Sequence, residues 1–70
     1  MKYLVVVEGG DSSFGAYVPD LPGCIAVASS RTEVMELLHD ASELHLEDLK
    51  DRGLTVPVPR SSPELIEVVA

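Results

Sequence analysis

The sequence of 70 residues contains a single cysteine, no tryptophan and only two histidines. One cysteine cannot close a disulfide within the chain, and together with two histidines it falls short of the usual ligands of a structural zinc site. We therefore expect no metal and no cofactor. Because so short a chain buries a modest core, the sequence favours self-association, as a homodimer or tetramer, as a further source of stability.

Basic and aromatic residues are also scarce. Five Lys and Arg stand against twelve Asp and Glu, and aromatic residues make up 4% of the chain. The formal net charge of −7 argues against DNA or RNA as a direct ligand, since phosphate contacts need clustered Lys and Arg. The same charge suits a basic protein partner.

Long apolar runs are missing as well. No stretch approaches the roughly 18 apolar residues of a membrane span, so we expect no membrane association. The five apolar residues before Glu8 are too few for a signal peptide. The sequence therefore predicts a cytoplasmic protein.

Three short segments have the composition of β-strands. "KYLVVVE" (2–8) is β-branched and almost continuously apolar, which predicts a central strand covered on both faces. "FGAYVP" (14–19) follows a short turn and completes a hairpin. "CIAVAS" (24–29) follows the turn "DLPG" (20–23), so the three segments predict an antiparallel meander.

A helix is predicted from Arg31 to about Arg52. "SRTE" (30–33) fits a capping box, and Gly53 supplies a left-handed C-terminal cap. One broad apolar face is expected, made of Val34, Leu37, Leu38, Ala41, Leu44 and Leu49. Met35 and Leu46 lie on a flank of that face, which makes them candidates for an oligomer interface.

The C-terminal part contains an extended linker (54–63) with three prolines and a short apolar segment, "ELIEVV" (64–69). We predict that 64–69 forms a fourth strand lying parallel beside the first, after a right-handed crossover. The predicted fold is α+β, in the order β-β-β-α-β: a four-stranded mixed sheet with one helix packed on one face. Residues 1–70 make one domain.

No catalytic residue is predicted. Cys24 has the character of a small core residue, and a nucleophilic role would require a nearby base. His39 and His45 are six residues apart on the predicted helix, so they cannot share a metal on one face. We expect His39 in solvent and His45 at the edge of the core.

Acidic residues leave two alternatives open. Glu8, Asp11 and Asp20 are ordinary turn and strand-end residues, or they bind Mg²⁺ in a nuclease site. Helix acids form a solvated face or a surface for a basic partner. The candidates for partner binding are Asp20, Glu43, Glu47, Asp48 and Asp51.

Two elements resemble a known family. "YLVVVE…FGAYVPDLPGC" and "SRTEV…ASELHLEDLKDRGLTVPVP" are similar, over residues 3–59, to the HicB antitoxins. The resemblance implies a partial ribonuclease H fold without catalysis, which binds HicA, a small basic toxin that cleaves RNA, and masks its active site. Ala28-Ser29-Ser30 replaces the family's Gly-Asp-Thr before the helix, but Ser30 keeps the capping hydroxyl.

The resemblance favours one function among three. The leading expectation is a non-enzymatic antitoxin domain that masks a HicA-type toxin. The alternatives are a stand-alone oligomeric structural or regulatory protein without a toxin, and a residual ribonuclease-H-like nuclease. Many HicB proteins add a C-terminal DNA-binding domain, which we do not expect in these 70 residues.

Overall fold

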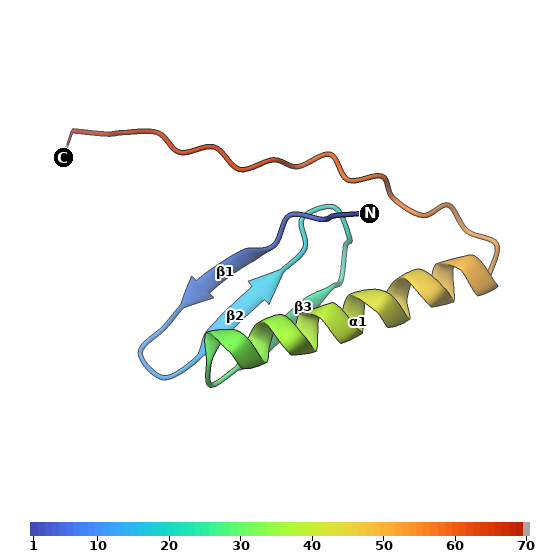
Figure 1. Ribbon diagram of the computed structural model, residues 1–70, viewed down its shortest axis with the longest axis horizontal. Coiled ribbons are helices and arrows are strands. Elements are labelled where there is room, and N and C mark those ends of the chain that lie inside the picture. The colour runs from blue at the N-terminus through green and yellow to red at the C-terminus, as the bar shows by residue number, and fades with distance from the viewer. Residues whose placement is uncertain (70) are drawn as a thin grey trace.

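The computed structural model describes residues 1–69, which form a three-stranded sheet followed by one helix (Figure 1). The strands are β1 (Val6–Gly9), β2 (Phe14–Tyr17) and β3 (Ile25–Ala28), and the helix is α1 (Arg31–Asp51). The sheet order is β1-β2-β3, and both neighbouring pairs are antiparallel. The predicted α+β class and the meander are confirmed.

One face of the sheet packs against α1. Val7, Ala16 and Ala26 are aligned across the three strands, so their side chains share a face. From α1, Val34 and Leu38 reach this face and are almost completely buried. The helix packs mainly on β2 and β3, and it covers β1 much less.

The loop between β2 and β3, residues 18–24, supplies half of the buried core. Val18, Leu21 and Cys24 join Ala16, Val34 and Leu38 there. The loop closes on itself through three backbone hydrogen bonds, including one of 3.1 Å from Val18 N–H to the Cys24 carbonyl. Gly23 has φ of +87°, a left-handed conformation that favours glycine. The prediction that Cys24 is a core residue is confirmed.

Both ends of α1 lie where the sequence predicts them. The Ser30 hydroxyl accepts a hydrogen bond of 3.1 Å from Glu33 N–H, while the Glu33 carboxylate accepts one of 3.0 Å from the Ser29 hydroxyl. The second bond replaces the return bond expected in a capping box. At the other end, Gly53 has φ of +69°, and Leu54 N–H donates to the Leu49 carbonyl, as in a Schellman motif.

The apolar face of α1 is narrower than predicted. Leu37 and Leu44 are exposed, because the helix is rotated so that Val34 and Leu38 point at the sheet. Leu46, predicted to lie on a flank, packs against the edge of the core. Met35, the other residue predicted on that flank, is exposed, as Leu37 and Leu44 are.

The four-stranded mixed sheet is not observed, and the sheet is purely antiparallel. Within residues 1–69, the segment 64–69 pairs with no strand, and β1 pairs only with β2. The predicted central strand is therefore an edge strand in this chain. Residues 54–69, here called the tail, instead run as an extended chain away from the end of α1 (Figure 1). Pro57, Pro59 and Pro63 have no backbone N–H to donate to a neighbouring strand. In addition, hydrogen bonds to Asp20 hold residues 60 and 61 in place.

Candidate partner-binding surface

The outer side of α1 carries a stripe of carboxylates, here called the acidic stripe. Its members recur every three or four residues and therefore share one side of the helix. They are Glu36, Asp40, Glu43, Glu47 and Asp51, and all five are exposed. The stripe lies opposite Val34 and Leu38, so packing of α1 on the sheet directs it into solvent. The helical period also places Glu36 and Asp40 on this side, and it could have added them to the residues predicted to bind a partner.

Asp48 lies outside the acidic stripe. Its Oδ2 is 3.2 Å from Arg52 Nη1, four residues later on the same helix. Both side chains are largely exposed, so this ion pair contributes little to stability. Arg52 does offset the charge of Asp48 locally. Of the helix residues predicted to bind a partner, Glu43, Glu47 and Asp51 therefore belong to the acidic stripe, and Asp48 does not.

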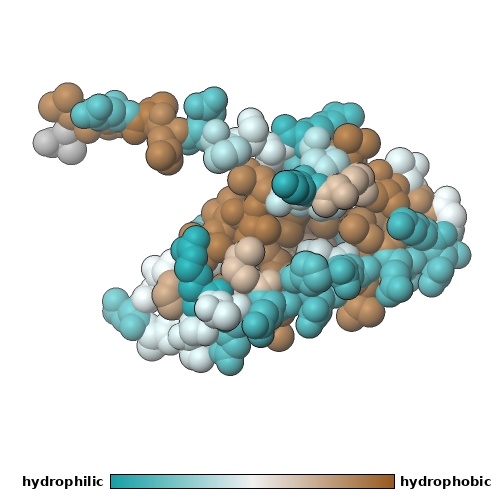
Figure 2. All heavy atoms as spheres, in the orientation of Figure 1, coloured by the Kyte–Doolittle hydropathy of each residue, from teal (hydrophilic) through white to brown (hydrophobic). Residues whose placement is uncertain are grey.

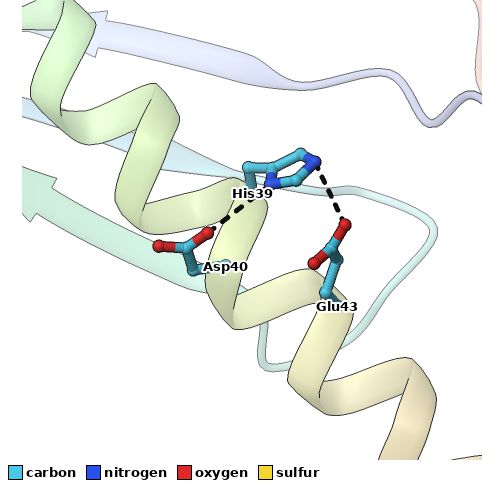
Figure 3. A network of polar contacts seen from close by, with 3 residues as sticks. All are labelled: His39, Asp40 and Glu43. Atoms are coloured by element: carbon cyan, nitrogen blue, oxygen red, sulfur yellow. Dashed lines mark ion pairs between the residues drawn. The ribbon is translucent and has the colours of Figure 1, made fainter.

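His39 lies beside the acidic stripe and between two of its members (Figure 3). Its Nδ1 is 3.6 Å from Asp40 Oδ1, and its Nε2 is 3.4 Å from Glu43 Oε1. When the imidazole is protonated, it places one positive charge against these two carboxylates. The side chain is exposed, as the sequence predicts.

Asp20 binds the tail. Its Oδ2 accepts hydrogen bonds of 2.9 Å from the backbone N–H groups of Arg60 and Ser61, and its Oδ1 accepts one of 2.9 Å from the Ser61 hydroxyl. The N–H groups of Ser61 and Arg60 hold the pKa of the Asp20 carboxyl below its ordinary value of 3.8. A second anchor lies nearby, where the Tyr3 hydroxyl donates to the Pro57 carbonyl.

An open apolar groove of about 400 Å³ lies between the segment leading into β1 and α1. Met1, Tyr3 and Val5 line one side, and Met35 and Leu46 line the other. The two predicted interface candidates thus border the same groove. Figure 2 shows hydrophobic side chains in the region between the tail and α1.

The residues considered for catalysis do not converge. Cys24 is buried in the core. Glu8 and Asp11 lie at the β1–β2 hairpin, whereas Asp20 follows the opposite end of β2 and binds the tail. Among the described residues, no group of three His, Cys, Asp or Glu side chains is placed to hold a metal ion. The sheet therefore separates the acids of the nuclease alternative.

In the part of the chain that the structure describes, no helix has both the length and the apolar character needed to cross a bilayer.

Comparison with known proteins identifies the family. Residues 3–69 match the model of the "HicB_like antitoxin of bacterial toxin-antitoxin system". A UPF0150 protein of Archaeoglobus fulgidus is 42% identical over 52 residues, which cover 73% of this chain and 75% of the relative.

The fold is also similar to that of a chain in the solved HicA3 and HicB3 toxin-antitoxin complex. The TM-score is 0.70 at 24% sequence identity, and the match covers 87% of this chain and 71% of the other. Since the family model spans nearly the whole sequence, this chain belongs to the HicB-like antitoxins of bacterial toxin-antitoxin systems.

Proposed function

We propose that this chain binds a small basic ribonuclease toxin of the HicA type and masks its active site without catalysing a reaction itself. The observation that carries the proposal is the family match over residues 3–69. It is supported by the similar fold of a chain in a complex that contains HicA3. The net charge of −7 fits a basic partner.

The acidic stripe is the surface we propose for the toxin. Its five carboxylates project from one rigid helix, so a basic surface can meet several of them at once. Complementary charge of this kind speeds association and selects the partner, and its effect falls as salt rises. Asp20 is a less accessible candidate, because the tail already occupies its carboxylate.

Charge reversal on the acidic stripe tests the proposal. The probe is a purified small basic protein of the HicA type. We expect Glu43→Lys/Glu47→Lys to weaken its binding by about tenfold or more at low salt, with a smaller loss at high salt. Isothermal titration at two salt concentrations measures the change.

The matched control is Glu8→Lys/Asp11→Lys, which changes the net charge equally at the exposed β1–β2 hairpin. It should bind nearly as well as the wild type. If both double variants lose affinity equally, the acidic stripe is not the contact surface. If the wild type binds no HicA-type protein at low salt, the antitoxin function is wrong for this chain.

A second candidate function is a stand-alone oligomer that acts without a toxin. The apolar groove favours it, because Met35 and Leu46 border an open surface of the kind that marks protein contacts. The groove and the acidic stripe meet at Glu43, which lines the groove, whereas Glu47 and Asp51 do not.

A further inference from the structure

Three features of the chain have no pairing or packing partner within residues 1–69. The outer edge of β1 forms no ladder, although "KYLVVVE" has the composition of a central strand. The apolar groove beside it is open. The segment 64–69 is extended and apolar, and Leu65, Ile66, Val68 and Val69 are 70% to 100% exposed.

The size of the molecule shows how much surface is uncovered. The radius of gyration is 14.0 Å, whereas a compact domain of this length has about 11 Å. The accessible surface is 5556 Å², against about 4200 Å² for a compact protein of 7.5 kDa. The excess of about 1300 Å² is more than the ~800 Å² that each partner buries in a standard protein interface.

The anchors of the tail direct 64–69 away from its own sheet. Asp20 holds residues 60 and 61, and Tyr3 holds Pro57, beside the end of the sheet where β1 begins. Beyond them residues 62–69 continue outward, and Figure 2 shows hydrophobic side chains along this part of the tail. An extended apolar segment that projects away from its own domain is placed to pair with another molecule.

We propose that residues 64–69 of one copy of this chain form a fourth strand on the β1 edge of a second copy, and that the exchange is reciprocal. Edge strands accept such additions through main-chain hydrogen bonds. Side chains alternate along a strand, so Ile66 and Val68 share one face, which covers the apolar groove beside Tyr3, Val5 and Met35. Two identical contacts close a twofold dimer and leave no strand segment unpaired at these edges.

The dependence on salt concentration distinguishes this contact from toxin binding. Each copy carries a net charge of −7, so two copies repel each other, and screening by salt strengthens an apolar contact between them. Toxin binding through the acidic stripe has the opposite salt dependence. The exchange requires no toxin, so it can fail or succeed independently of the proposed function.

The test uses the full chain in multi-angle light scattering and amide hydrogen exchange. We expect the wild type to have at least twice the chain mass, with protected amides in 64–69. Ile66→Asp should weaken dimer formation at least tenfold and remove that protection. Since Ile66 is 86% exposed in the single chain, the variant leaves the monomer fold intact, which circular dichroism of α1 verifies.

The matched control is Leu44→Asp, which adds the same charge at a side chain that is 67% exposed on α1. It should form dimers as the wild type does. A monomeric wild type overturns the proposal. This includes a monomer in which the amides of 64–69 are protected from exchange because the segment pairs with β1 of the same chain. A dimer that survives Ile66→Asp, or one in which 64–69 exchanges freely, also overturns it.

Discussion

The loop 18–24 and the tail are both irregular and proline-containing, yet their side chains have opposite environments. The loop buries Val18, Leu21 and Cys24 in the core. The tail leaves Leu65, Ile66 and Val69 in solvent. Hydrophobicity does not explain the difference, because both segments are rich in aliphatic residues.

The difference comes from where the backbone hydrogen bonds go. The loop makes its own: Val18 N–H bonds the Cys24 carbonyl, Leu21 N–H bonds Val18, and Cys24 N–H bonds Leu21. A segment that satisfies its polar groups locally can be buried. The segment 64–69 is extended and rich in aliphatic residues, as strands are, and a strand needs a neighbour to satisfy its backbone. The comparison teaches that an irregular loop can complete a core, while a strand-like segment stays exposed until an edge receives it.

Leu21→Ala should give the largest effect of the changes that test this comparison. Leu21 is fully buried, so its truncation should lower the free energy of unfolding by about 2–5 kcal/mol, a large share of the stability of a small domain. Urea denaturation measures the loss. Val58→Ala in the tail, at a side chain that is 64% exposed, should change stability by less than about 0.5 kcal/mol. Equal losses would show that the loop is no more important to the core than the tail.

Gly23→Ala should give a smaller loss of about 1–2 kcal/mol. Gly23 has φ of +87°, where a Cβ is strained, although no neighbouring atom lies within 4 Å of that position. Thermal unfolding measures the loss. Gly15→Ala is the control, since its Cβ also meets open space and its φ is not left-handed. A Gly23→Ala protein as stable as Gly15→Ala would mean that the loop does not depend on this conformation.

Asp20→Ala should free the tail with little effect on the folded body. We expect the amides of Arg60 and Ser61 to lose protection in hydrogen exchange, while those of α1 keep theirs. Asp11→Ala, at the exposed hairpin turn, is the control and should change neither. Retained protection at Arg60 and Ser61 in Asp20→Ala would show that other contacts hold the tail.

Acid should reproduce this release in the wild type. The pKa of Asp20 is lower in the folded chain than in the unfolded one, because the N–H groups of Ser61 and Arg60 favour the carboxylate. The anchor is therefore complete above the ordinary pKa of 3.8 and is lost as pH falls through the lower folded value. Amide shifts of Arg60 and Ser61 followed by NMR should titrate below pH 3.8 and stay constant above about pH 5.

Several local features could be predicted from the sequence because short-range chemistry sets them. Ser30 and Gly53 determine the ends of α1 through hydrogen bonds to residues within one turn. The short segment between β1 and β2 fixes the hairpin. Other features depend on distant residues. The helical period alone could not tell that Leu46 packs against the core while Leu37 and Leu44 are exposed.

The sequence by itself determined the helix limits, the meander, the burial of Cys24 and the resemblance to the HicB family, because these follow from local spacing and motif. Only the tertiary structure decided the part played by Asp20, which binds residues 60 and 61 from forty positions away. It also decided that β1, composed as a central strand, is an edge in the single chain. Local composition specifies that a strand needs neighbours, but long-range contacts determine where those neighbours lie.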